Sequence, residues 1–315
     1  MTTPTPAAPD FAAALQRPGE LVLFGLTPPR ATVGTERAHQ IAAATLQRIN
    51  NLSLDALLLY DLDDESDRTT QTRPFHFSPA MDPAVYAQDY LTDGHWPTVV
   101  YRSVGKYPQA ELAAWMESAP PGQAAVLVGA SSAGKPVRTR LADAQQLCRT
   151  RRPDMPLGGV AIPERHSARG DEHLRLLRKQ AAGVSFFVTQ VVYDVRAAKD
   201  LASDYTYACH EQGMTPVRLI FTLSLCGSLK TLDFLRWLGV DVPRWVSNEL
   251  TNAPDPLGLS MLHALDTARD LRAFCAHLGL PCGFNIESVS NRKSEIEAAV
   301  HLARQVAFET GASHP

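Results

Sequence analysis

Residues 185–210 read SFFVTQVVYDVRAAKDLASDYTYACH and contain one strand followed by one helix. Apolar and β-branched residues dominate residues 185–193, which predicts a strand covered on both faces. Apolar residues then recur with helical spacing over residues 197–210, which predicts an amphipathic helix. A strand followed by a helix is the repeating unit of proteins with a parallel β-sheet.

The same unit recurs along the whole chain of 315 residues. We expect strands at residues 20–26, 54–62, 98–103, 124–129, 158–162, 185–193, 217–225 and 282–289. Helical patterns separate these strands, and a last one closes the chain at residues 293–308. Eight such units predict an α/β fold, a single (β/α)8 TIM barrel. A doubly wound open sheet is the alternative, but the turn after the first strand, Thr27-Pro28-Pro29-Arg30, lacks the glycine pair that would bind a pyrophosphate.

The segment between the seventh and eighth strands is longer than the other connections. It contains a helical pattern over residues 257–278, which we interpret as a helical insertion before strand eight and not as a second domain. The first residues are rich in Thr, Pro and Ala and predict a disordered tail over residues 1–17. The barrel domain is then expected over residues 18–315.

Composition argues against several classes of partner. The chain has 30 Lys and Arg against 33 Asp and Glu, so no basic excess indicates nucleic-acid binding. No apolar run approaches the roughly 20 residues that cross a bilayer, and the first ten residues lack the features of a secretory signal. Five widely spaced cysteines predict free thiols in a reducing compartment. We therefore expect a cytoplasmic protein with a small-molecule partner and no membrane partner.

In a TIM barrel the chemistry is found where the carboxyl ends of the strands meet. Glu164 and His166 follow the fifth strand, whereas Gln190 and Glu287 are polar residues within apolar strands. Burying such a group costs roughly 1–3 kcal/mol unless it is paired, so each is either a site residue or an internally bonded one. The histidines show no H-E-x-x-H pattern, so no metal site is predicted. The loop 129–136 resembles a P-loop, but Pro136 stands where the motif needs Ser or Thr.

Three segments in consecutive units resemble the methylenetetrahydrofolate reductase family. They are GGVAIPERH at residues 158–166, LRKQAAG at residues 177–183 and VTQVVYD at residues 188–194. Weaker similarity extends to residues 24–30, to Asp67-Arg68-Thr69 and to residues 242–245, so the resemblance covers nearly the whole chain from about residue 20.

The resemblance implies a TIM barrel that binds FAD and transfers a hydride from NAD(P)H to 5,10-methylenetetrahydrofolate, a tetrahydrofolate derivative. It implies that His166 contacts the flavin and that Glu172 replaces an aspartate on the ribityl chain. Arg178 and Lys179 match basic residues near the flavin phosphates. Gln190 matches a glutamine at the folate and nicotinamide site, and its neighbours Thr189 and Tyr193 are expected to line the same substrate site.

The chain departs from the family pattern at three positions. Gly25 stands where the family has a glutamate acting as general acid, Ala130 where it has an aspartate near the flavin and pterin, and Ile162 where an aromatic residue packs against the flavin. We therefore expect FAD to be weakly bound or lost. Glu287 is the first candidate for a relocated acid and Glu164 the second.

Two other functions stay open at this point. One is a reductase that dispenses with flavin and takes the hydride directly from NAD(P)H. The other is a folate-binding protein or a folate-dependent C1 transferase without hydride chemistry. A homo-oligomer is compatible with the sequence, which does not distinguish NADH from NADPH.

Overall fold

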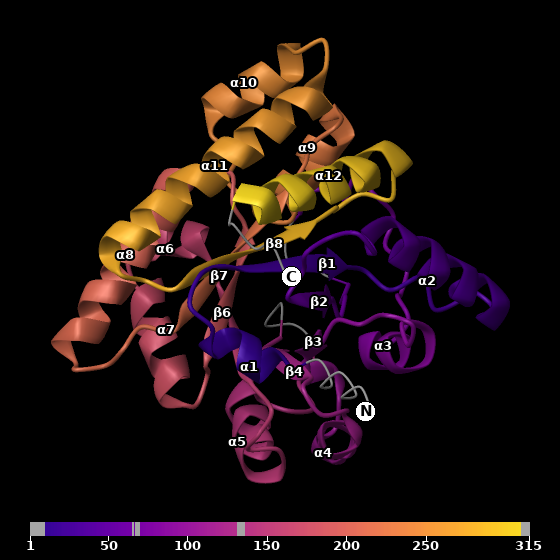
Figure 1. The fold of residues 1–315 in the computed structure, drawn as a ribbon, viewed down its shortest axis with the longest axis vertical. Coiled ribbons are helices and arrows are strands. Elements are labelled where there is room, and N and C mark those ends of the chain that lie inside the picture. The colour runs from indigo at the N-terminus through magenta and orange to yellow at the C-terminus, as the bar shows by residue number, and fades with distance from the viewer. Residues whose placement is uncertain (1–9, 65, 67–69, 131–135, 310–315) are drawn as a thin grey trace, which may run out of the picture.

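Eight parallel strands form a closed barrel in which β8 pairs with β1. The computed structural model describes residues 10–64, 66, 70–130 and 136–309. The strands are β1 (Leu21–Leu26), β2 (Ala56–Leu59), β3 (Thr98–Ser103), β4 (Ala124–Val128), β5 (Leu157–Ala161), β6 (Phe186–Val191), β7 (Arg218–Ser224) and β8 (Cys282–Glu287). Figure 1 shows the helices around this ring. The prediction of a TIM barrel is confirmed.

One principal helix follows each strand. These helices are α2 (Thr35–Ile49), α3 (Pro83–Tyr90), α4 (Gln109–Ser118), α5 (Leu141–Arg151), α7 (Glu172–Ala181), α8 (Val195–Glu211), α9 (Leu229–Trp237) and α12 (Lys293–Glu309). The predicted insertion before β8 is confirmed and contains two helices, α10 (Arg244–Asn252) and α11 (Pro256–Leu278). In Figure 1, α10 lies beyond the ring at the top of the view. A short helix that we did not predict, α6 (Pro163–Arg169), begins directly after β5.

The barrel interior is filled by the inward side chains of the strands. Leu23, Leu58, Val126 and Val188 belong to this inner cluster, and each is fully buried. The opposite faces of the strands pack against the helices in a larger apolar cluster. A Cβ atom on Gly158 would lie 2.5 Å from Cζ of Phe186, so only glycine leaves room for that ring. Strands buried on both faces explain the nearly continuous apolar runs in the sequence.

A short helix, α1 (Phe11–Gln16), packs against the inner apolar cluster of the barrel. The side chain of Asp10 accepts a hydrogen bond from the Ala12 amide and caps the helix. Phe11 is fully buried, and its ring meets Phe186 edge to face with centroids 5.2 Å apart. The prediction of a disordered tail over residues 1–17 is therefore wrong for residues 10–17, because burial of Phe11 orders them. Residues 1–9 lie outside the described residues.

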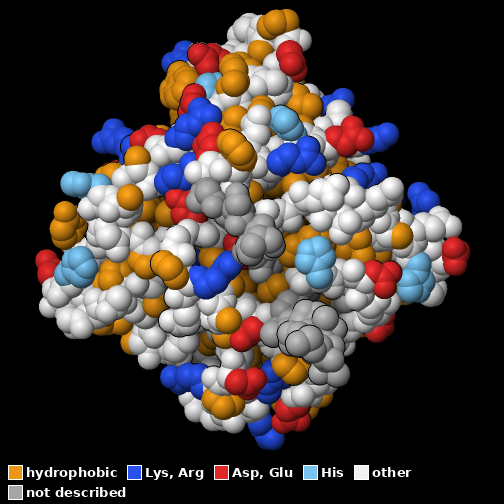
Figure 2. All heavy atoms as spheres, in the orientation of Figure 1, with side chains coloured by type: hydrophobic (Ala, Val, Ile, Leu, Met, Phe, Trp, Pro, Cys, Tyr) orange, Lys and Arg blue, Asp and Glu red, His pale blue; other side chains and the backbone are white. Residues whose placement is uncertain are grey.

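The outer surface carries charges of both signs. On the face drawn in Figure 2, basic and acidic side chains are interspersed. Among the described residues, no helix is long and apolar enough to span a membrane. All five cysteines are free and buried, as predicted.

We expect Phe11→Ala to lower the free energy of unfolding by about 3–5 kcal/mol, the usual cost of truncating a buried phenylalanine. Urea denaturation measures this change. Phe308→Ala is the matched control because its side chain is 86% exposed, and it should change the stability by less than about 0.5 kcal/mol. Equal effects of the two substitutions would contradict the packing of α1 in the barrel.

Candidate functional site

Two polar side chains lie side by side near the carboxyl end of β8. Asn285 is fully buried and Glu287 is 9% exposed. The Asn285 amide donates to the Tyr60 hydroxyl at 2.9 Å and to the Thr222 hydroxyl at 3.4 Å. The Tyr60 ring packs against Tyr101, with centroids 4.9 Å apart. We call Tyr60, Tyr101, Asn285 and Glu287 the β8 cluster.

Gly25 on β1 leaves the space that the β8 cluster occupies. A Cβ atom at this position would lie 3.0 Å from Cβ of Glu287, 3.1 Å from Oδ1 of Asn285 and 3.2 Å from Cε2 of Tyr60. Any larger side chain on β1 would therefore push the cluster aside. The glycine at position 25, where the reductase family has a glutamate, is therefore what allows Glu287 to pack at this place.

Burial changes the acidity of the cluster. It raises the pKa of Glu287 to about 7, although hydrogen bonds from Tyr60 and Asn285 oppose the shift. The pKa of Tyr60 is also raised, first by burial and then by the nearby Glu287 carboxylate. Near neutral pH the Glu287 carboxyl therefore exchanges a proton readily, which is the property that a general acid or base requires.

Two acceptor oxygens of the cluster have no partner. Oδ1 of Asn285 and Oε2 of Glu287 are buried, yet neither accepts a hydrogen bond from any residue that the structure describes. A buried acceptor without a donor costs about 1–3 kcal/mol. A ligand that brings N–H donors to this end of the barrel would recover that cost.

Glu164 and Gln190 form a second group, above β5 and β6. Glu164 Oε1 accepts from the Asp241 amide at 3.4 Å, and the Gln190 amide donates to the Leu238 carbonyl at 3.1 Å. Both therefore contact the segment that follows α9. Burial raises the pKa of Glu164 to about 7. Gln190 lies where the pairing of β6 with β7 is irregular, a position at which strands commonly redirect a side chain.

The other two predicted substrate contacts use their polar groups internally. The Thr189 hydroxyl accepts from the Thr222 amide at 3.0 Å, and the Thr189 carbonyl accepts from the Thr222 hydroxyl at 2.8 Å. The Tyr193 hydroxyl donates to the Ser224 carbonyl at 2.9 Å. These bonds join β6, and the residues that follow it, to β7, and they account for both polar side chains without a ligand.

The residues expected to hold flavin are also engaged with the protein. Glu172 is fully buried and accepts from the Ile162 amide at 3.2 Å and from Arg165 at 3.0 Å. Lys179 donates to the Val160 carbonyl, and burial lowers its pKa to about 8.

The other two residues expected to hold flavin, His166 and Arg178, have different surroundings. His166 pairs with Asp204 on α8 at 3.0 Å, and Arg178 is exposed on α7. Of the four residues expected to hold flavin, Glu172, Lys179 and His166 thus bond to other parts of the protein, whereas the Arg178 side chain is exposed to solvent. Asp67-Arg68-Thr69 and most of the loop 129–136 lie outside the described residues.

A segment from the β2–α3 connection docks on α9. The Trp237 indole donates to the Gln71 carbonyl at 3.2 Å, and the Arg73 guanidinium lies 4.7 Å from the centroid of the Trp237 ring. Phe75 meets Phe234 edge to face at 5.1 Å. Because β2 and β7 are separated by β1 and β8 in the ring, this segment connects loops across the carboxyl end of the barrel. It joins the two sides of the end at which the β8 cluster lies.

A cavity of about 880 Å³ lies at the other end of the barrel, near α1. Its lining includes Arg17, Glu20, Arg218 and Arg272. Arg218 donates to the carbonyls of Gly19 and Cys282, both at 2.6 Å, and Arg272 pairs with Glu20 at 2.8 Å. These charges hold the closed end of the barrel together, and TIM barrels carry their chemistry at the opposite end.

Sequence reasoning selected Glu287, Glu164 and Gln190 as candidates but did not select Tyr60, Tyr101 or Asn285. Asn285 could have been found, because it stands two residues before Glu287 and so shares its face of the strand. Nothing in the sequence indicates that Tyr60, from the other side of β1, completes the group.

We expect the effect of Glu287→Gln on stability to depend on pH. The folded protein keeps the Glu287 proton up to about pH 7, whereas the unfolded chain loses it near pH 4.5. Wild-type stability from this group is therefore full below about pH 4.5 and is lost as the pH rises to 7, while the amide does not titrate. Urea unfolding should show the variant gaining stability relative to wild type between pH 5 and pH 7.5.

Glu297→Gln is the matched control, because the Glu297 side chain is 56% exposed on α12. A stability difference between Glu287→Gln and wild type that is the same at both pH values would contradict a raised pKa.

No protein-family model and no curated protein matches the chain. The solved structure of apo-MsnO8 is 10% identical, covers 93% of this chain and 99% of that chain, and has a TM-score of 0.53, which shows the fold alone. An uncharacterized protein from Clostridium thermocellum that binds two copies of 5-methyl-5,6,7,8-tetrahydrofolic acid is far more similar, with a TM-score of 0.83.

This second match has 39% sequence identity and covers 95% of this chain and 98% of that chain. Identity at this level over nearly the whole length of both proteins shows common ancestry as well as a common fold. The chain belongs to the family of the Clostridium thermocellum protein that binds 5-methyl-5,6,7,8-tetrahydrofolic acid.

Proposed function

We propose that the protein binds a reduced folate at the carboxyl end of its barrel, with the β8 cluster holding the pterin ring. The relative from Clostridium thermocellum binds 5-methyl-5,6,7,8-tetrahydrofolic acid, which makes this ligand class the first candidate. The function that we propose is folate binding. A folate-dependent C1 transferase would bind the folate in the same way and would also bind a second substrate.

The observation that carries this proposal is the pair of buried acceptors, Oδ1 of Asn285 and Oε2 of Glu287. A pterin presents an amino group and a ring N–H along one edge, and such donors suit adjacent carboxamide and carboxylate oxygens. The Tyr60 and Tyr101 rings border the same cluster, where they can contact a flat heterocycle. Gly25 leaves the space on β1 in which the side chains of the cluster pack.

Gln190 is the second contact that we propose, because it lies at the same end of the barrel on a redirected part of β6. We do not assign substrate contacts to Thr189 and Tyr193, whose polar groups already bond to β7. Glu164 is placed to interact with a ligand through its unpaired, buried Oε2 atom.

Isothermal titration with 5-methyltetrahydrofolate tests the proposal. We expect wild type to bind, and Asn285→Ala and Gln190→Ala each to weaken binding by about 1–3 kcal/mol, roughly 5- to 150-fold. Gln146→Ala is the matched control, since Gln146 is exposed on α5. Absence of binding by a folded wild-type protein would overturn the proposal. If Gln146→Ala weakened folate binding as much as the other two substitutions, the assignment of Asn285 and Gln190 as contacts would be wrong.

Reduction of 5,10-methylenetetrahydrofolate by NAD(P)H is the second candidate function. Its supporting observation is Glu287, a buried carboxyl with a pKa of about 7 beside the position where the reductase family has its acid. In this alternative pose the bridging nitrogen of the folate, and not the N–H edge of the pterin, lies at Glu287, which protonates it, and Glu164 is the alternative donor. The engaged side chains of Glu172, Lys179 and His166 do not fit FAD, so the proposal contains no flavin step.

We expect NAD(P)H oxidation with 5,10-methylenetetrahydrofolate to fall by about 10²- to 10⁴-fold in Glu287→Gln, the usual contribution of a general acid, while folate still binds. Glu164→Gln measured in parallel distinguishes the two candidate acids. Unchanged turnover in Glu287→Gln would remove its assignment. A wild-type protein that binds folate without oxidising NAD(P)H would leave binding or C1 transfer as the function.

A further inference from the structure

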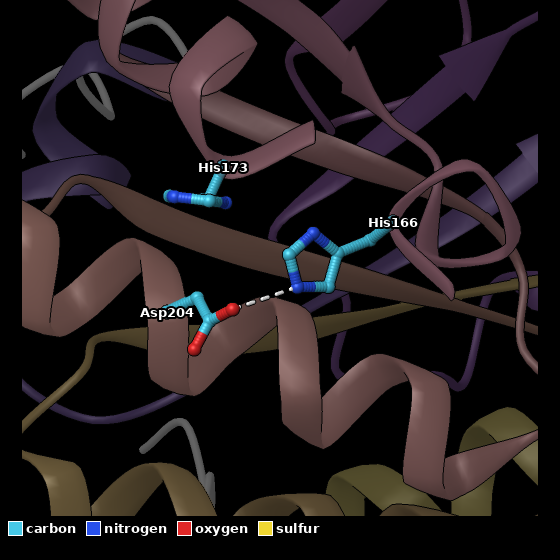
Figure 3. Close-up of side chains that lie close together, drawn as sticks. All are labelled: His166, His173 and Asp204. Atoms are coloured by element: carbon cyan, nitrogen blue, oxygen red, sulfur yellow. Dashed lines mark hydrogen bonds and ion pairs between the residues drawn. The ribbon is translucent and has the colours of Figure 1, made fainter. Parts of the chain in front are cut away.

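A group of metal-ligating side chains lies in the helical layer, apart from the β8 cluster. His166 comes from α6, His173 from α7 and Asp204 from α8. Figure 3 shows the His166 ring and the Asp204 carboxylate pointing toward each other, with His173 beside them. His166 Nε2 is 3.0 Å from Asp204 Oδ2, and the two imidazole rings are perpendicular with centroids 5.3 Å apart.

The two histidines have coordination capacity that the protein does not use. His166 is 5% exposed, and the Nδ1 atoms of both His166 and His173 are buried without a hydrogen-bond partner among the described residues. A buried nitrogen without a hydrogen-bond partner lowers the stability of the folded protein. Two imidazoles with unpaired nitrogens, grouped with a carboxylate, indicate a ligand that accepts electron pairs.

The distances suit a small divalent cation. One ligand atom from each side chain can be chosen so that all three lie within 4.8 Å of one another. Zinc bonds of about 2.0–2.1 Å in a tetrahedral site place ligands roughly 3.3 Å apart, so a closure of about 1.5 Å completes the geometry. His166 and Asp204 are already 3.0 Å apart, and the half-buried His173 and the Asp204 side chain, which is 56% exposed, have room to adjust.

We propose that His166, His173 and Asp204 bind a divalent metal ion, for which Zn²⁺ is the best chemical match. Two imidazoles and one carboxylate are borderline ligands with one negative charge, and a water completes the fourth position. The ion ties α6 to α7 and α8. It thereby steadies α6, the helix that carries Glu164 toward the carboxyl end of the barrel. The same coordination uses the His166 ring that the reductase resemblance assigns to flavin.

Titration of the chelator-treated full-length protein with ZnCl₂ tests this site. We expect one Zn²⁺ per chain, a rise in melting temperature on binding, and a visible Co²⁺ spectrum typical of tetrahedral coordination. Asp204→Asn and His173→Ala should each weaken Zn²⁺ binding at least tenfold. Both variants leave the buried His166 in place, and circular dichroism verifies that they remain folded.

His210→Ala is the matched control, because His210 is an exposed histidine at the end of the same helix α8. It should bind Zn²⁺ as tightly as wild type. Lack of stoichiometric binding by wild type would overturn the site and leave only the hydrogen bond between His166 and Asp204. Unchanged affinity in both Asp204→Asn and His173→Ala would likewise overturn the site.

Discussion

A carboxyl and a carboxamide buried next to each other at the end of β8 constrain everything around them. Asn285 and Glu287 lie where most strands of the barrel present apolar side chains. Tyr60 and Thr222 supply hydrogen-bond partners for the Asn285 amide, and Gly25 supplies the space. Two oxygens nevertheless remain unpaired. A protein retains such a cost most readily where a ligand removes it, which is why we place the folate there.

The two ends of the barrel differ in the contacts that their side chains make. At one end α1 and the Arg218 guanidinium close the barrel with apolar packing and carbonyl contacts. The β8 cluster, Glu164 and Gln190 belong to the other end, where the contact of Arg73 with Trp237 joins the β2–α3 connection to α9. The contacts that close the barrel thus lie opposite the end that carries the candidate site, an arrangement that is usual in TIM barrels. Glu164 and Glu287 both have a raised pKa because that end excludes water without offering enough partners.

The barrel was predictable because its signal is local and repeated. Each apolar run, such as residues 185–193, predicts its own strand, and eight of them leave few alternatives. α1 was missed because one buried aromatic residue, Phe11, orders it through a tertiary contact with Phe186. The flavin contacts were expected by resemblance, yet Glu172 and Lys179 turn inward to bond Ile162 and Val160. The grouping of His166 with His173 and Asp204 depends on how three helices pack, which spacing along the chain does not encode.

The central claim is that the pterin of a reduced folate binds at the β8 cluster. A crystal structure of the complex with 5-methyltetrahydrofolate tests it most directly. The account predicts pterin N–H groups within hydrogen-bond distance of Asn285 Oδ1 and Glu287 Oε2, with the ring near Tyr60. A folate seated instead in the cavity beside Arg218 and Arg272 at the opposite end, with the β8 cluster unliganded, would contradict it.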